Sequence, residues 1–182
     1  IQKFDRQGNL LAAWGADDGY SLAMDDRQGI LYVPLPSAGY VGMFDAQGSL
    51  LGRITAPAGE GALAVYLTLS ASGELFVNGG DRVLVFDRTH LPERTWLFPD
   101  GSPGARGIAV GPDGNLYVAS ASTAQVLSYD PTGHYLASFA LPAGSLPYGL
   151  TCDLAGHLWV AVPNKDRVYE YTITGTLLCT LG

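Results

Sequence analysis

The sequence is poor in cysteine and in charge. Its only cysteines are Cys152 and Cys179, too few for a disulfide framework. Charged residues make up 15% of the 182 positions, against about 25% in an average globular protein. The balance is acidic, with a formal net charge of −7 and lysine only at Lys3 and Lys165. This argues against nucleic-acid binding, because a basic surface is needed to displace counterions from phosphates.

The sequence also has no long apolar segment. The longest stretch without Asp, Glu, Lys or Arg covers residues 131–152 and contains three prolines and three glycines. Such a stretch cannot form a membrane-spanning helix, so no membrane insertion is expected. An apolar content of 47% together with the low charge excludes a disordered chain.

Glycine is abundant, at 24 residues, and recurs with a regular period. The unit at 107–119 returns at 149–161, and earlier copies lie at 21–33 and 67–77. A second signature, an aromatic residue usually followed by Asp, begins at positions 4, 44, 86, 129 and 171. A repeat of about 42 residues indicates an array of identical structural units.

Each unit contains four short apolar runs separated by turn residues. In the best copy the runs cover 107–110, 116–119, 126–129 and 135–139, too short for helices and rich in Val, Leu, Tyr and Phe. The Gly-Pro-Asp-Gly sequence at 111–114 fits a type I turn, and Asp-x-x-Gly sequences separate the last two runs. One copy has His90 in place of this glycine, and His tolerates positive φ better than most residues.

Four antiparallel strands repeated every 42 residues predict an all-β fold, a β-propeller. The pattern of Gly107–Ala119, Asn164–Val168 and Phe44–Gly48 resembles the NHL repeat. The resemblance covers the whole chain and implies a propeller of four-stranded blades, commonly six to a ring.

Four complete blades are predicted at 18–54, 62–98, 104–140 and 146–182, preceded by a half blade at 1–15. We therefore expect part of a larger ring, with exposed blade faces at its open ends that allow self-association. The alternative is a closed four-bladed ring with residues 1–15 packed outside it. Trp14 and Trp96, in the predicted outer strands, are expected to fill the wedge between neighbouring blades.

One rim of the predicted propeller carries tight turns, and the other carries the longer and more varied loops. The longer loops are the better candidate binding face. They place Tyr20, Arg106 and Tyr148 at equivalent positions just before the innermost strands, and Tyr40, Arg82 and Arg167 between the second and third strands. Tyrosine and arginine are typical of binding hot spots. Alternatively, Arg82 and Arg167 pair with the aspartates that precede them and tie strands together.

No metal or cofactor is predicted, because His90, His134 and His157 fall in or beside turns without the close spacing of metal ligands. The leading hypothesis is a non-catalytic binding or assembly module that presents its loop-rich rim to a protein partner or subunit. The alternative is part of a propeller enzyme, since propellers that resemble this one include lactonase-like hydrolases and lyases with a site at the central channel. By analogy with exported bacterial propellers, a periplasmic or secreted location is expected.

Overall fold

The computed structural model describes residues 1–15, 19–58, 66–98 and 104–182. Within these residues, every regular element apart from two single-turn 3₁₀ helices is a β-strand. The half-blade has strands β1 (Gln2–Phe4) and β2 (Leu10–Ala13). Blade one has β3 (Ala23–Asp25), β4 (Ile30–Leu35), the helix η1 (Pro36–Ala38), β5 (Tyr40–Phe44) and β6 (Leu50–Thr55).

The remaining blades repeat this plan. Blade two has β7 (Tyr66–Leu69), β8 (Leu75–Asn78), β9 (Arg82–Phe86) and β10 (Pro92–Leu97). Blade three has β11 (Ala105–Val110), β12 (Leu116–Ser120), β13 (Gln125–Tyr129) and β14 (Tyr135–Ala140). Blade four has β15 (Gly149–Cys152), β16 (His157–Val162), the helix η2 (Pro163–Lys165), β17 (Arg167–Thr172) and β18 (Leu177–Leu181).

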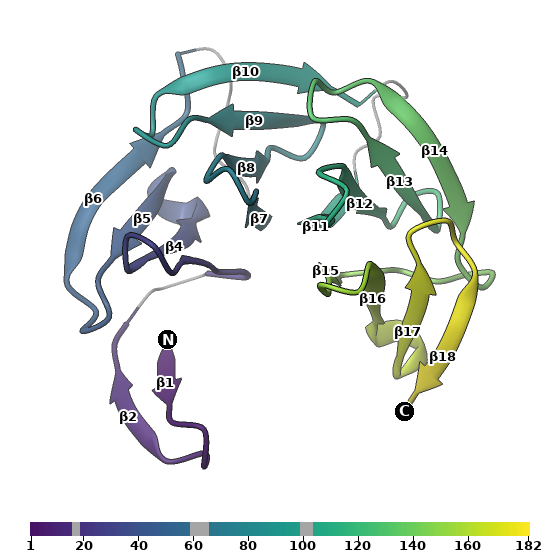
Figure 1. Cartoon of the computed structure of the whole chain (residues 1–182), viewed down its shortest axis with the longest axis horizontal. Helices are drawn as coiled ribbons and strands as arrows, with labels where there is room; N and C mark the ends of the chain where they lie inside the picture. Colours follow the sequence, from purple (N-terminus) through teal and green to yellow (C-terminus); the bar gives the residue numbers. More distant parts are fainter. Residues whose placement is uncertain (16–18, 59–65, 99–103) are drawn as a thin grey trace.

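Each blade is an antiparallel sheet whose strands follow chain order from the centre outwards. Figure 1 shows the blades side by side in an open arc, with β7, β11 and β15 near the axis and β10 and β14 on the outside. The half-blade continues the arc beside blade one, where Ile1 and Trp14 pack against Val33, Leu35 and Phe44.

The central strands are apolar throughout because both of their faces are covered. In β12 all five residues are buried. Leu116 and Val118 join the cluster shared with blade two, whereas Tyr117 and Ala119 join the cluster shared with blade four. Successive side chains of a strand point to opposite faces, so a strand between two blades needs apolar residues at every position.

The outer strands interlock through an aromatic side chain and a glycine turn. The ring of Trp96 in β10 lies where a Cβ on Gly133 would be placed, 2.5 Å from its Cγ, and Phe139 in β14 covers Gly175 in the same way. Both glycines also have φ near +90°, which only glycine adopts readily. The turn glycine is therefore required twice, by its backbone angle and by the neighbouring blade's aromatic ring.

The predicted fold is confirmed: the chain is all-β, with four four-stranded blades in a propeller arrangement. The described residues do not form the closed four-bladed ring that was the alternative, because residues 1–15 occupy a place in the arc. The predicted boundaries at 18 and 62 lie outside the described residues, and the blade number of a full ring stays a prediction. Among the described residues, no helix is long and apolar enough to cross a bilayer.

Candidate binding site at the mouth of the central pocket

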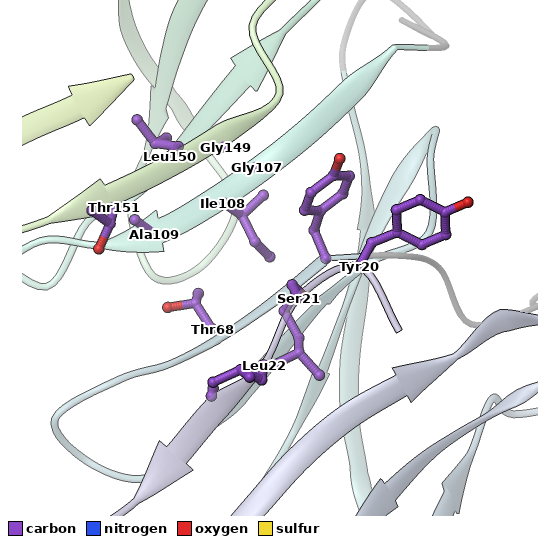
Figure 2. Close-up of a pocket in the computed structure, with 13 residues that line it drawn as sticks. Tyr20, Ser21, Leu22, Thr68, Gly107, Ile108, Ala109, Gly149, Leu150 and Thr151 are labelled. Carbon is purple, nitrogen blue, oxygen red and sulfur yellow. The ribbon is translucent and has the colours of Figure 1, made fainter. Parts of the chain in front are cut away.

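A pocket of about 260 Å³ lies at the axis, between the innermost strands of all four blades. Figure 2 shows Ser21 and Leu22 of blade one on one side of it, and Ile108 and Leu150 of blades three and four on the other. Tyr20 stands at its edge. The pocket is lined by equivalent positions of the repeat, at or just before the first strand of each blade.

Three of the predicted site residues belong to this region, and two of them touch. The guanidinium carbon of Arg106 lies 3.8 Å from the centroid of the Tyr148 ring. Stacking of this kind suits the planar guanidinium and is strongest where water is excluded. Tyr20 and Tyr148 are both exposed, at 65% and 40%, so their rings are available to a binding partner.

The contact between Arg106 and Tyr148 depends on the close approach of strands β11 and β15. The Gly107 amide donates a hydrogen bond of 2.8 Å to the carbonyl oxygen of Tyr148. A Cβ on Gly107 would lie only 2.4 Å from the backbone nitrogen of Leu150, so no larger residue fits there. On the other side, the Asn78 side-chain amide donates to the Arg106 carbonyl at 2.8 Å, which fixes the backbone that carries the guanidinium.

Tyr66 completes the cluster. Burial raises the pKa of its hydroxyl, whereas a hydrogen bond and the positive charge of Arg106 lower it, and Tyr148 and Tyr20 raise it slightly. The phenol therefore stays protonated and can donate a hydrogen bond. Among the described residues, Nε of Arg106 is buried without a hydrogen-bond partner, and a buried donor of this kind gains free energy when it finds an acceptor.

The sequence prediction did not include Tyr66. Its repeat position is Gly107 and Gly149 in blades three and four and Ser21 in blade one. A large aromatic residue where the other copies have Gly or Ser is a departure from the repeat, and this departure was the available signal. The Tyr66 ring is also buried in the cluster between blades two and three, so it packs as well as lining the pocket.

The other three predicted residues lie apart from this pocket, each at the start of a third strand. Tyr40 packs against the guanidinium of Arg53, at 4.7 Å. Arg82 forms an ion pair of 2.8 Å with Asp81. Arg167 donates to the Asp166 backbone carbonyl at 3.0 Å, not to its carboxylate. Arg82 thus pairs with the carboxylate of the aspartate that precedes it, whereas Arg167 contacts only the backbone of its own. Because each contact joins consecutive residues, neither of them links two strands.

The histidines sit at three different turns. His90 is half-buried, and its Nε2 lies 2.8 Å from the Tyr32 hydroxyl of the preceding blade. His134 is exposed beside Asp130, and His157 lies 2.9 Å from Glu170. In the described part of the chain, no three His, Cys, Asp or Glu side chains are grouped in a way that could hold a metal ion. Both cysteines are free thiols.

Comparison with known proteins gives the fold and leaves the family open. No protein-family model matches the sequence, and no curated protein does. Among solved structures, the chain is similar to virginiamycin B lyase from Staphylococcus aureus, with a TM-score of 0.75 and 18% identity, over 99% of this chain and 61% of that one. It is also similar to a protein of unknown function from Bacteroides caccae, with a TM-score of 0.74 and 18% identity, over 97% and 66%.

Two further solved structures are also similar to this chain. A streptogramin B lyase matches with a TM-score of 0.72 and 18% identity, over 87% of this chain and 53% of that one. Hydrazine synthase from Kuenenia stuttgartiensis matches with a TM-score of 0.69 and 17% identity, over 96% and 51%. The chain thus spans about half to two thirds of the length of these proteins. At identities this low, the similarity shows only the fold, a β-propeller.

Proposed function

We propose that the chain is a non-catalytic binding module of an NHL-like propeller, and that Tyr20, Tyr66, Arg106 and Tyr148 contact a protein partner at the mouth of the central pocket. The observation that carries the proposal is the stack of Arg106 on Tyr148. A guanidinium whose carbon lies 3.8 Å from the centroid of an exposed ring is held in place by that ring, and its planar set of N–H donors suits a carboxylate.

The chemistry of the partner follows from this cluster. A carboxylate side chain, from Asp or Glu, can accept hydrogen bonds from Arg106 and from a tyrosine hydroxyl. The rings of Tyr20 and Tyr148 provide apolar area for the residues on either side of it, because both rings are exposed. We therefore expect recognition of an acidic residue flanked by apolar ones, with the short-range guanidinium contact outweighing the net charge of −7.

A pair of matched peptides tests this. Acetyl-Phe-Glu-Leu-amide and the same peptide with Gln in place of Glu are titrated by NMR into the 15N-labelled chain. The Glu peptide is expected to shift the amide signals of Gly107 and Gly149, and the Gln peptide to bind at least tenfold more weakly. Equal binding of the two peptides would overturn the proposed carboxylate recognition.

The variant Arg106→Ala should remove binding of the Glu peptide, and Arg106→Lys should weaken it because the ammonium cannot stack in a plane. Arg53→Ala is the matched control, since Arg53 also stacks on a tyrosine but belongs to the outer strand β6. If Arg106→Ala and Arg53→Ala behaved alike while both kept the circular dichroism spectrum of the parent chain, the cluster would have no binding role.

The second candidate is an enzyme with a site at the same axis, a hydrolase or a lyase. It is favoured by the central pocket with the buried phenol of Tyr66 and by the lyases among proteins of similar fold. A further structure of similar fold is a catalytically inactive virginiamycin B lyase variant with quinupristin. Conversion of quinupristin by this chain can be followed by liquid chromatography. If the chain converts quinupristin and the variant Tyr66→Phe does not, the chain is an enzyme and the proposal of a non-catalytic binding module is wrong.

A further inference from the structure

The first strand of blade three differs from the other first strands by a β-bulge. Strands β3, β7 and β15 pair with their neighbours without a shift of register. In β11 the register shifts between Ala105 and Ile108, so that Arg106 and Gly107 together stand opposite one residue of β12. A bulge of this kind disrupts the ladder locally and re-aims a side chain. The side chain at this bulge is that of Arg106, whose guanidinium lies over the ring of Tyr148.

Groups from both neighbouring blades hold this bulge. From blade four, the carbonyl oxygen of Tyr148 accepts a hydrogen bond of 2.8 Å from the Gly107 amide. From blade two, the side-chain amide of Asn78 donates to the carbonyl oxygen of Arg106, also at 2.8 Å. These bonds replace the ladder bonds that a bulge disrupts, and backbone groups away from water need such partners. Three blades therefore contribute to the position of the Arg106 guanidinium.

Asn78 is itself a departure from the repeat. At the equivalent position, the other blades have residues without a polar side chain, Pro34, Ala119 and Ala161. Asn78 is only 1% exposed, and burial of an amide is costly unless it is hydrogen-bonded. Its oxygen accepts from the Gly80 amide at 2.8 Å, and its nitrogen donates to Arg106. Since alanine serves at this position in two blades, the fold does not require the amide there.

We propose that Asn78 is a positioning residue of the binding site. Its hydrogen bond to the bulge sets the direction of the Arg106 guanidinium, and thereby the preference of the site for a carboxylate over a neutral amide. This inference rests on the proposed function, in which Arg106 binds a carboxylate of the partner. It adds that recognition depends on the contact between blades two and three as well as on the contact between blades three and four.

The first measurement needs no partner. The ring current of Tyr148 moves the proton NMR signals of the Arg106 side chain to high field, because the guanidinium lies over the ring. In Asn78→Ala this displacement should fall to less than half, since the bulge loses its bond to blade two. Asn78→Ser keeps a donor on a shorter side chain and should retain more of the displacement. Both variants are expected to keep the parent circular dichroism spectrum, because other blades have alanine at this position.

Tyr32→Phe is the matched control. The Tyr32 hydroxyl lies 2.8 Å from Nε2 of His90, so this variant also removes a hydrogen bond between two blades, here blades one and two. It should leave the Arg106 signals at their parent positions. The second measurement uses the Glu and Gln peptides. Asn78→Ala should lose about fivefold in affinity for the Glu peptide, the effect of one hydrogen bond, and little for the Gln peptide, whereas Tyr32→Phe should bind both like the parent.

Three results would overturn the proposal. The first is an unchanged position of the Arg106 signals in Asn78→Ala. The second is an equal change of these signals in Tyr32→Phe, since any weakened blade interface would then suffice. The third is an unchanged preference of Asn78→Ala for the Glu peptide. Equal affinity of the parent chain for the two peptides would instead overturn the proposed function, and the Arg106 signals would still decide whether Asn78 positions the guanidinium.

Discussion

Equivalent interfaces between neighbouring blades are built in two ways. Between blades two and three, the ring of Trp96 lies over Gly133 and packs against the ring of Tyr129, with centroids 5.0 Å apart. Between blades one and two, the smaller Ile54 takes the outer-strand position equivalent to Trp96, and His90 takes the turn position equivalent to Gly133. A large ring thus accompanies a glycine, and a smaller side chain accompanies a turn residue that has a side chain of its own.

The difference shows that the turn residue and the outer-strand residue of the preceding blade form one packing unit. Phe139 with Gly175 and Trp14 with Gly48 repeat the arrangement of ring and glycine. Where the ring is absent, His90 supplies a contact of its own, a hydrogen bond to Tyr32 across the interface. The following predictions test this pairing, beginning with the largest expected effect.

Trp96→Ala is expected to lower the free energy of unfolding by about 3 kcal/mol, since truncation of this partly buried tryptophan removes its packing against the core and leaves a cavity. The cavity would be bounded by Phe98 and Tyr129, which both contact the ring. Urea denaturation followed by circular dichroism measures the change. Trp96→Phe is the control. Among the described residues, Nε1 of Trp96 is buried without a hydrogen-bond partner, so phenylalanine gives up no hydrogen bond. This variant should lose less than half as much unfolding free energy as Trp96→Ala. An equal loss in both variants would contradict the packing explanation.

Gly133→Ala is expected to cost about 2–3 kcal/mol, from the positive φ and the clash of the new Cβ with Trp96. Gly114→Ala isolates the first of these contributions, because Gly114 has a similar φ but nothing within 4 Å of its Cβ position. It should therefore cost about 1 kcal/mol. The two variants are compared in the same urea titration. If Gly114→Ala were as damaging as Gly133→Ala, the ring contact would contribute nothing.

Ile54→Trp should transfer the arrangement of blades two and three to the neighbouring interface. Alone, it is expected to cost about 2 kcal/mol, because Ile54 is buried and a larger side chain overpacks the core. Combined with His90→Gly, the cost should fall by about 1 kcal/mol, since the turn then offers a surface without a side chain. A double-mutant cycle measures this coupling. Strict additivity of the two substitutions would show that the ring and the glycine are independent.

The His90 interface should also weaken at acid pH. Burial lowers the pKa of His90 below its usual 6.5, although Asp87 and Asp25 act in the opposite direction. The unfolded chain therefore binds the proton more readily than the folded one. The stability that neutral His90 contributes is fully present above pH 6.5 and is lost as the pH falls through the lowered folded pKa. The free energy of unfolding should therefore be lower at pH 5 than at pH 7.5.

His90→Gln is the control for this pH dependence, because Gln can accept the Tyr32 hydrogen bond without titrating. Unfolding midpoints in urea at the two pH values should differ less in this variant than in the parent chain. The carboxylates near this turn have lowered pKa values, so they do not titrate in this window. An unchanged pH slope in His90→Gln would assign the effect to another group.

The sequence predicted the fold well because the repeat is periodic in both turns and strands. The runs predicted at 116–119 and 126–129 became β12 and β13, each within one residue at either end. The positive φ expected at His90 is observed at 66°. These features are local, since they depend on a few neighbouring residues and on the alternation of side chains along a strand.

The site was predicted only in part, because its contacts join residues far apart in the chain. The repeat placed Tyr20, Arg106 and Tyr148 at equivalent positions, but equivalence does not state which of them touch. The stack of Arg106 on Tyr148 depends on the backbone approach at Gly107, and Tyr66 stands out only when the four copies are aligned. The repeat spacing also predicted the same environment for Arg82 and Arg167, although their hydrogen-bond partners differ.

That last difference gives the smallest predicted effect. The guanidinium of Arg82 bonds the Asp81 carboxylate, whose pKa it lowers, whereas Arg167 bonds the Asp166 carbonyl. Asp81→Asn should therefore cost about 0.5 kcal/mol, within the range of partly exposed ion pairs. Asp166→Asn should cost nothing measurable, because φ at Asp166 is 52° and asparagine tolerates this conformation well. Urea titrations at low and at 0.5 M salt should show a salt-dependent loss for Asp81→Asn alone. A comparable loss in Asp166→Asn would mean that its carboxylate, and not the shape of its turn, stabilises the fourth blade.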